Sequence, residues 1–127
     1  MKVNTPILAL VVSGAVMATS AGFAQGRAAG AAAPPDPAKV TAGKAQFEET
    51  KCTKCHGPDG LGDKDGKLSL ATGAAKLSPA DIRKWITSPA EMTAKLPKKP
   101  KEAMKKFDLT DAQVDNLVAF VESLSRK

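Results

Sequence analysis

The chain has 127 residues, of which 43% are hydrophobic and 25% are charged, within the usual range of soluble globular proteins. This length allows one compact domain and excludes a multidomain enzyme. Two cysteines exclude a disulfide-rich scaffold, and four phenylalanines, one tryptophan and no tyrosine leave few large side chains for a core. The formal net charge of +6 favours acidic partners or surfaces but defines no fold.

Residues 1–24 have the three-part layout of a secretory signal peptide. Lys2 precedes an uncharged run over 7–18, and small residues near the end suit cleavage after Ala24. The alternative is an uncleaved membrane anchor, but the strongly apolar part covers only about a dozen residues, whereas a spanning helix needs about 20. We therefore expect a cleaved signal peptide and a periplasmic protein, which would be membrane-anchored if the leader were kept.

A segment rich in alanine, glycine and proline follows, over 25–37, and its lack of a periodic apolar face predicts a tether. From residue 38 onward, charged residues alternate with spaced apolar ones to the C-terminus, without another linker or a repeat. The predicted organisation is therefore a signal peptide over 1–24, a tether over 25–37 and a functional domain over 38–127.

The first predicted helix of this domain contains Val40, Gly43 and Phe47, which are three and four residues apart. The region 51–73 follows, rich in glycine and aspartate and without the alternation typical of strands. We expect this region to be a long loop.

Two capping motifs predict the later helices. In the first, Ser78 caps a helix that has Pro79 at its first position and Asp81 reaching back, and the stretch Thr87-Ser88-Pro89 ends that helix. In the second, Thr110 and Gln113 begin a C-terminal helix. The apolar stripes comprise Ile82, Trp85 and Ile86 in the former, and Val114, Leu117, Val118, Val121 and Leu124 in the latter. No strand pattern competes, so the domain is predicted to be all-α.

Both cysteines and the single histidine lie within Cys52-Thr53-Lys54-Cys55-His56. Cys-x-x-Cys-His is the attachment signature of c-type haem, in which Cys52 and Cys55 form thioether bonds and His56 is an axial ligand of the iron. Export agrees with this, because thiols joined to haem are protected in an oxidising compartment. One covalent haem c per chain would also supply the apolar surface that the small core lacks.

Two other uses of these residues fit less well. A redox-active disulfide of the thioredoxin type expects a βαβ context, which the sequence does not predict. A structural zinc site needs four ligands, so the motif would require a carboxylate such as Asp59 or a second copy of the chain. We therefore favour covalent haem.

The other axial position is narrowed by elimination to a methionine, a lysine, water or an open site. Met1 and Met17 belong to the leader, which leaves Met92 and Met104. Met104 lies in a stretch without helical signals that can fold across the open haem face, whereas Met92 follows Pro89 at the end of the preceding helix. We favour Met104. His/Met ligation leaves no position for a substrate, so we expect outer-sphere electron transfer rather than enzyme catalysis.

Further motifs accompany the haem motif along the whole domain. They are Gly43 with Phe47, the stretch CTKCHGPDGLG over 52–62, Trp85-Ile86, Met104-x-x-Phe107-x-Leu109-Thr110, and Leu117-Val118-Ala119-Phe120-Val121. With them, residues 40–127 resemble a monohaem class I cytochrome c. The resemblance implies a small all-α fold, with three to five helices and long loops wrapped around one covalent haem, whose first and last helices cross near Gly43 and Phe120.

Two positions depart from the pattern of that family. Members usually carry a proline after the glycines of the haem motif, whose carbonyl accepts the other N–H of the ligand histidine, and a proline after the axial methionine. The counterparts here are Gly66-Lys67-Leu68 and Met104-Lys105. We expect the carbonyl of a lysine, Lys67, to accept the bond from His56.

Lysines crowd the segment around Met104, namely Lys95, Lys98, Lys99, Lys101, Lys105 and Lys106. By the resemblance, the haem edge is exposed near this loop, so the positive charge would steer an acidic docking surface of a redox partner toward it. The alternative is a solvated loop kept soluble by its lysines. Nucleic acid is not an expected partner, because no aromatic residues are interleaved with these lysines.

The sequence therefore predicts a periplasmic one-electron carrier with His/Met-ligated haem c. A second interpretation is an electron-transfer subunit bound permanently to a periplasmic oxidoreductase, and a third is a haem protein that binds or senses a ligand. We expect a monomer or a subunit of a redox complex, without a membrane span once the signal is cleaved.

Overall fold

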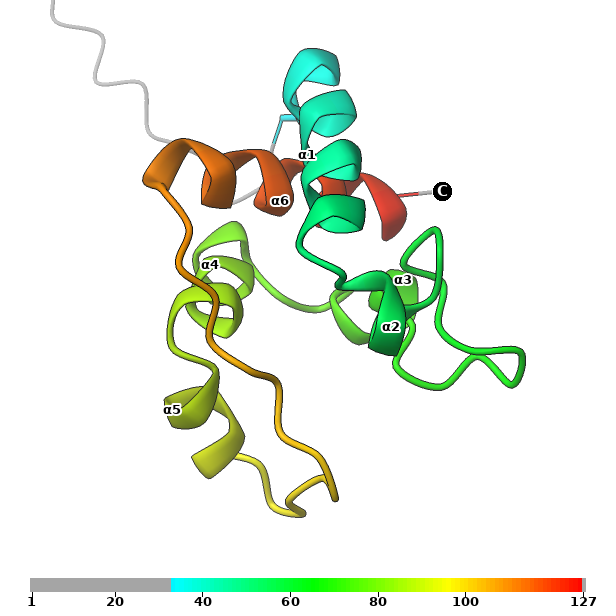
Figure 1. Ribbon diagram of the computed structural model, residues 1–127, viewed down its shortest axis with the longest axis vertical. Helices are drawn as coiled ribbons and strands as arrows, with labels where there is room; N and C mark the ends of the chain where they lie inside the picture. The colour runs from blue at the N-terminus through cyan, green and yellow to red at the C-terminus, as the bar shows by residue number, and fades with distance from the viewer. Residues whose placement is uncertain (1–32, 127) are drawn as a thin grey trace, which may run out of the picture. The chain divides into compact units, whose positions relative to one another are not determined.

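The computed structural model describes residues 33–126, which belong to one compact unit (Figure 1). The predicted signal peptide and most of the predicted tether lie outside the described residues. The elements are α1 (Pro37–Glu49), α2 (Thr53–His56), α3 (Leu70–Gly73), α4 (Pro79–Thr87), α5 (Pro89–Ala94) and α6 (Asp111–Leu124). Residues 33–126 contain no strand, so the all-α prediction is confirmed. No helix in this range is long and apolar enough to cross a membrane.

Helix α1 begins at the end of the segment predicted as a tether. The Asp36 carboxylate accepts a hydrogen bond of 2.8 Å from the backbone N–H of Ala38, and Pro37 occupies the first helical position, where its missing N–H costs nothing. Gly43 and Phe47 are the buried residues of this helix, as their spacing predicted. They form the face of α1 that packs against α6.

The two predicted capping boxes are both present. The Ser78 hydroxyl accepts from the N–H of Asp81 at the start of α4, and the Asp81 side chain accepts from the N–H of Ser78. Thr110 and Gln113 form the same reciprocal pair at the start of α6. Each box satisfies two of the backbone donors that a helix leaves free at its first turn.

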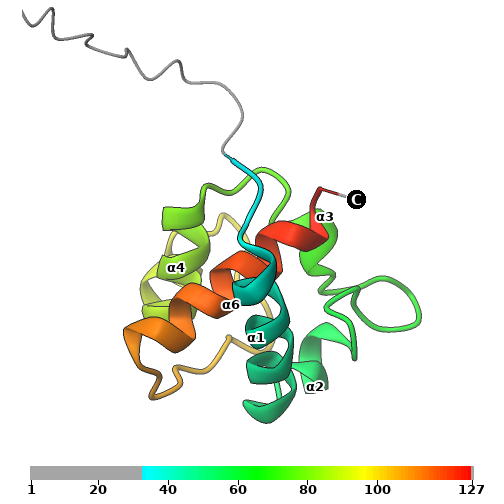
Figure 2. The same ribbon diagram turned by 90° about the horizontal axis from the view of Figure 1, so that it is seen from above.

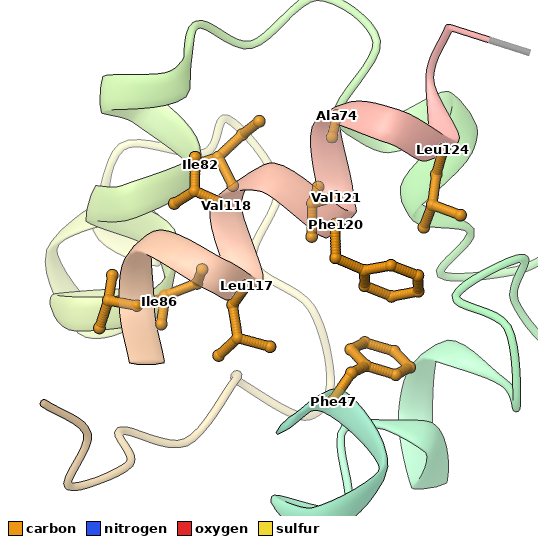
Figure 3. Packing of buried hydrophobic residues seen from close by; sticks show 10 residues of the cluster. Phe47, Ala74, Ile82, Ile86, Leu117, Val118, Phe120, Val121 and Leu124 are labelled. Carbon is orange, nitrogen blue, oxygen red and sulfur yellow. The ribbon is translucent and has the colours of Figure 1, made fainter. Parts of the chain in front are cut away.

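The core lies between α6 and the helices on either side of it. Every member of the predicted α6 stripe is buried, with Ala119 and Phe120 in addition. Phe47 of α1 faces Phe120 of α6 with ring centroids 5.2 Å apart, while Ile82 and Ile86 of α4 cover the other end of α6 (Figure 3). This small aromatic and aliphatic cluster forms one wall of the site described below.

Surface ion pairs join α4 to α6 and α1 to the loop after α2. Arg83 of α4 pairs with Asp115 and Asp111 of α6, the latter at 3.5 Å. Lys44 of α1 pairs with Asp59 of the loop after α2 at 3.1 Å. The first fixes α4 on α6, and the second joins α1 to the loop that follows the Cys-x-x-Cys-His motif.

The region 51–73 is not a plain loop, because it contains the one-turn helices α2 and α3. Helix α2 ends at Gly57, whose φ of 75° favours glycine and where a Cβ would collide with the backbone of Gly62. The loop returns here, with the N–H of Gly62 donating to the carbonyl of His56 at 2.8 Å. Turns this short carry too little periodicity to be detected in a sequence.

The segment 95–110 connects α5 to α6 without regular helix or strand. In Figure 1 it leaves the end of α5 and returns past α5 and α4 to the start of α6, while α2 and α3 lie on the other side of the domain; Figure 2 shows the same separation from above. The irregular structure around Met104 agrees with its lack of helical signals in the sequence.

Candidate functional site

A cavity of about 470 Å³ lies between these two sides of the domain. This volume is in the range of about 300–1,000 Å³ that is typical of small-molecule and cofactor sites. Its wall is mainly apolar and draws on distant parts of the chain, including Phe47, Leu70, Leu77, Ile82, Trp85, Phe107, Leu117 and Val121. Cys52, His56 and Met104, three of the four residues predicted to hold a haem, also line it.

His56 reaches the cavity wall at the end of α2 with one ring nitrogen already bonded. Its Nδ1 lies 2.8 Å from the backbone carbonyl oxygen of Leu68. Since a carbonyl only accepts, Nδ1 carries the proton and Nε2 keeps a free lone pair. That is the tautomer a metal-ligating histidine needs, with its orientation fixed by the carbonyl.

The accepting carbonyl belongs to Leu68 and not to Lys67, so that expectation was wrong. The carbonyl of Lys67 already accepts from the N–H of Asp63 at 3.0 Å. The Asp63 carboxylate in turn accepts from the N–H groups of Asp65 and Lys67, both at 2.9 Å. This closes residues 63–67 into a small loop, and the next free carbonyl is that of Leu68.

Leu68 has a φ of 59°, in the left-handed region that non-glycine residues seldom adopt. Such a conformation costs about 1–2 kcal/mol and persists only where surrounding contacts fix it. Here it accompanies the turn of the Leu68 carbonyl toward His56, and Leu68 also lines the cavity. The residue that orients the histidine is therefore one of two non-glycine residues in the described range with a left-handed backbone, the other being Lys51.

The two cysteines lie in the turn that leads into His56. Cys52 caps α2, and its carbonyl accepts from the N–H groups of Cys55 and His56 at 3.2 and 3.0 Å. The three-residue spacing puts the two Cβ atoms on neighbouring positions of one helical turn. Cys52 lines the cavity, whereas Cys55 is exposed and is not part of the lining.

The hydroxyl of Thr50 lies beside the Cys52 thiol, with Oγ1 3.2 Å from Sγ. Because the Thr50 hydroxyl donates to the carbonyl of Gln46 at 2.6 Å, it is available to the cysteine as an acceptor. Burial raises the pKa of the Cys52 thiol above its ordinary value. The fold therefore holds a neutral thiol at the cavity wall.

The structure separates the two candidate methionines. Met104, in the irregular segment, lines the cavity together with Cys52 and His56. Met92 lies in α5, a helix that the sequence did not predict, and is not among the lining residues.

Sequence reasoning missed Thr93 of α5, a buried polar residue of the cavity wall. Its side chain is 8% exposed, and its Oγ1 is the one buried side-chain oxygen or nitrogen in the described part of the chain without a hydrogen-bond partner. Glu102, an exposed residue, also contributes to the wall. No motif marks either residue, because both depend on how α5 and the segment after it fold.

These residues fit a haem. An apolar wall suits the faces of a porphyrin, and the thiols of Cys52 and Cys55 suit covalent attachment. The free Nε2 of His56 and the sulfur of Met104 are ligands that haem iron accepts.

The lysine segment, residues 95–106, alternates between the cavity wall and solvent. Leu96, Pro100, Glu102 and Met104 line the cavity. The lysines between and beside them are exposed: Lys95, Lys98, Lys99, Lys101, Lys105 and Lys106. Positive charge therefore borders the cavity on this side.

A protein-family model described as Cytochrome c matches residues 40–125. No curated protein and no solved structure matches the chain. The matched range runs from Val40 of α1 through α6 and includes both cysteines, His56 and Met104.

Proposed function

The chain belongs to the cytochrome c family, and on that premise we propose that it is a periplasmic one-electron carrier with one haem c, held by Cys52 and Cys55 and ligated by His56 and Met104. Membership implies a covalently bound haem c and a role in electron transfer. Members of this family generally carry electrons rather than catalyse reactions.

The observation that carries the proposal is the meeting of Cys52, His56 and Met104 on the wall of one apolar cavity. These residues come from two segments almost fifty residues apart in the chain. A haem bound there supplies a one-electron redox couple at its iron, whose potential a methionine ligand raises.

The chain's own residues would restrict the site to electron transfer. His56, oriented by Leu68, and Met104 would occupy both axial positions, leaving none for a substrate. The wall offers no second histidine as a proton donor, because the sequence contains one histidine in all. The apolar side chains of the cavity wall keep water away from the site. This limits the reorganisation of solvent when the charge at the site changes.

The proposed location and partners rest on the leader and on the lysine segment. Residues 1–24 have the layout of an export signal, and domains of this family are typically extracytoplasmic. The lysines bordering the cavity support docking of a redox partner through an acidic surface. We propose a free monomeric carrier; native gel filtration at the monomer mass would support this, and elution with a larger oxidoreductase would contradict it.

The experiment that tests the proposal is the visible and near-infrared absorption spectrum of the mature protein, oxidised and then reduced. We expect a sharp low-spin c-type spectrum after reduction and a weak near-infrared methionine-to-iron band in the oxidised state. A high-spin spectrum, or carbon monoxide binding to the reduced protein, would contradict electron carriage and favour ligand binding. The absence of haem absorption from a correctly matured sample would contradict the haem proposal as a whole.

A further inference from the structure

His56 is held at two points, by residues on either side of the loop over 63–67. The N–H of Gly62, just before this loop, donates to the backbone carbonyl of His56 at 2.8 Å. The carbonyl of Leu68, just after the loop, lies 2.8 Å from Nδ1 of the His56 ring. Because the first contact fixes one end of the loop on His56, the closure of the loop decides whether the second contact can form.

Asp63 closes this loop with both its backbone and its side chain. Its N–H donates to the carbonyl of Lys67 at 3.0 Å, and its Oδ1 accepts from the N–H of Lys67 at 2.9 Å. Oδ1 also accepts from the N–H of Asp65 at 2.9 Å, and the Asp63 carbonyl accepts from the N–H of Gly66 at 2.8 Å. Lys67 is thereby fixed at both its N–H and its C=O, and Leu68 is the next residue in the chain.

The Leu68 carbonyl needs such support to stay directed at the histidine. A proline at the orienting residue would restrict φ to about −65°, whereas Leu68 has a φ of 59°. A left-handed backbone at a non-glycine residue persists only where its surroundings impose it. Leu68 is 61% exposed, so packing of its side chain against the protein supplies little of that support. The hydrogen bonds at the base of the loop are left to supply it.

We propose that Asp63 is a positioning residue for the haem ligand His56 and acts through Lys67 and Leu68. Its carboxylate holds the base of the loop closed, and this keeps the Leu68 carbonyl on the Nδ1–H of the ring. The inference rests on the proposed function, because it concerns a ligand of the haem iron. It adds to that function a residue outside the cavity wall, since neither Asp63 nor Lys67 lines the cavity.

The expected consequence is a change in the reduction potential. A hydrogen bond from Nδ1–H to a carbonyl makes the imidazole a stronger electron donor to the iron. Stronger donation favours the oxidised state, which carries the higher positive charge, so this bond lowers the potential. Loss of the Asp63 carboxylate should release the Leu68 carbonyl and raise the potential. At a fixed solution potential, the ratio of reduced to oxidised protein should then rise by about two- to tenfold, the equilibrium effect of one ordinary hydrogen bond.

The test uses haem-loaded variants that separate the geometry of the Asp63 side chain from its charge. Asp63→Asn keeps an oxygen in the same position without the charge, and should retain the wild-type potential. Asp63→Glu keeps the charge but moves the carboxylate by one methylene, and Asp63→Ala removes it, so both should show the raised potential. Asp65→Ala is the matched control, because it removes a charge from the same loop whose carboxylate pairs with the Lys67 ammonium at 3.5 Å rather than with the backbone.

A second measurement follows the bond to His56 itself. The exchange of the Nδ1 proton with deuterated solvent is observed by NMR in the reduced protein, and it requires this bond to open. We expect about two- to tenfold faster exchange in Asp63→Ala and Asp63→Glu, and wild-type exchange in Asp63→Asn and Asp65→Ala. If Asp63 only stabilised a surface turn, the unfolding free energy would fall while this proton and the potential stayed unchanged.

A wild-type potential or a wild-type exchange rate in loaded Asp63→Ala would overturn the inference. A raised potential shared by Asp63→Asn and Asp65→Ala would also overturn it, because the effect would then come from the lost charge. If Asp63→Ala does not load haem, Asp63→Glu is measured in its place, with the same outcomes. Absence of haem from the wild type would instead contradict the proposed function, so the two failures are distinguishable.

Discussion

Gly43 on α1 lies directly against the backbone carbonyl of Asn116 on α6, so a Cβ at residue 43 would collide with that carbonyl and with Phe120. Helices α1 and α6 therefore approach each other closely at Gly43, a residue without a side chain. The same crossing brings Phe47 onto Phe120, and Phe47 also lines the cavity. The close approach of α1 to α6 therefore also determines where Phe47 lies in the cavity wall.

Gly43→Ala should destabilise the protein by about 1–3 kcal/mol, the usual cost of overpacking, even though alanine favours a helix more than glycine does. The neighbouring substitution Ala42→Ser adds an atom on the exposed face of α1 and serves as the control. Urea unfolding of the haem-loaded proteins measures both. Equal unfolding free energies for the two variants would show that the crossing can widen without cost.

Met104→Ala should abolish the near-infrared methionine-to-iron band and lower the reduction potential, because a thioether ligand raises it. Met92→Ala is the matched control and should retain both properties, since Met92 is not part of the cavity wall. The oxidised absorption spectrum and a redox titration are the measurements. Loss of the band in Met92→Ala with retention in Met104→Ala would reverse the assignment.

Leu68→Gly should keep the bond to His56, which involves only the backbone of residue 68, and should relieve a left-handed strain of about 1 kcal/mol. Leu68→Pro should break the arrangement, because proline fixes φ near −65° and cannot adopt 59°. We expect a wild-type reduction potential in the glycine variant and a changed one in the proline variant. A wild-type potential in both would mean that the Leu68 carbonyl does not tune the site.

The hydroxyl of Ser78 holds the pKa of the Asp81 carboxyl below its ordinary value, with a further contribution from the Ser78 N–H. A carboxyl whose pKa is lower in the folded state stabilises the protein above its unfolded pKa, and this is lost as the pH falls through the folded pKa. Asp81→Asn should therefore be less stable than the wild type at neutral pH, and the difference should shrink in acid. Unfolding free energies over a pH series test this, and a constant difference would contradict it.

The lysine segment should make electron transfer to an acidic redox protein depend on salt. Raising the ionic strength from about 0.01 to 0.15 M shortens the screening length from about 30 to 8 Å, so the second-order rate should fall steeply. The double variant Lys105→Gln/Lys106→Gln should weaken this dependence, whereas Lys39→Gln on α1 should not. A flat rate for the wild type would identify the lysines as a solvated loop.

Local signals in the sequence predicted much of this fold. The boxes at Ser78 and Thr110 involve residues three apart, so the sequence contains the whole interaction. The motif from Cys52 to His56 likewise indicates haem attachment from five consecutive residues. Patterns of this kind need no knowledge of the rest of the chain.

What could not be predicted depends on how distant parts of the chain meet. The choice of the Leu68 carbonyl over that of Lys67 follows from a bond to Asp63 that closes the intervening loop. The burial of Thr93 in the cavity wall depends on α5, a helix that the sequence did not predict. Both features concern the surroundings of the site rather than its ligands.

The loop over 63–67 satisfies its own backbone through Asp63, and a Cβ at Gly66 would meet nothing within 4 Å. The hydrogen bonds of this loop are thus local, and there is open space around Gly66. Insertions or peptide tags placed between Lys64 and Asp65 would lengthen a part of the surface that is anchored at its base. This makes the loop a natural position for immobilising the protein on an electrode, next to the histidine that the base of the loop orients.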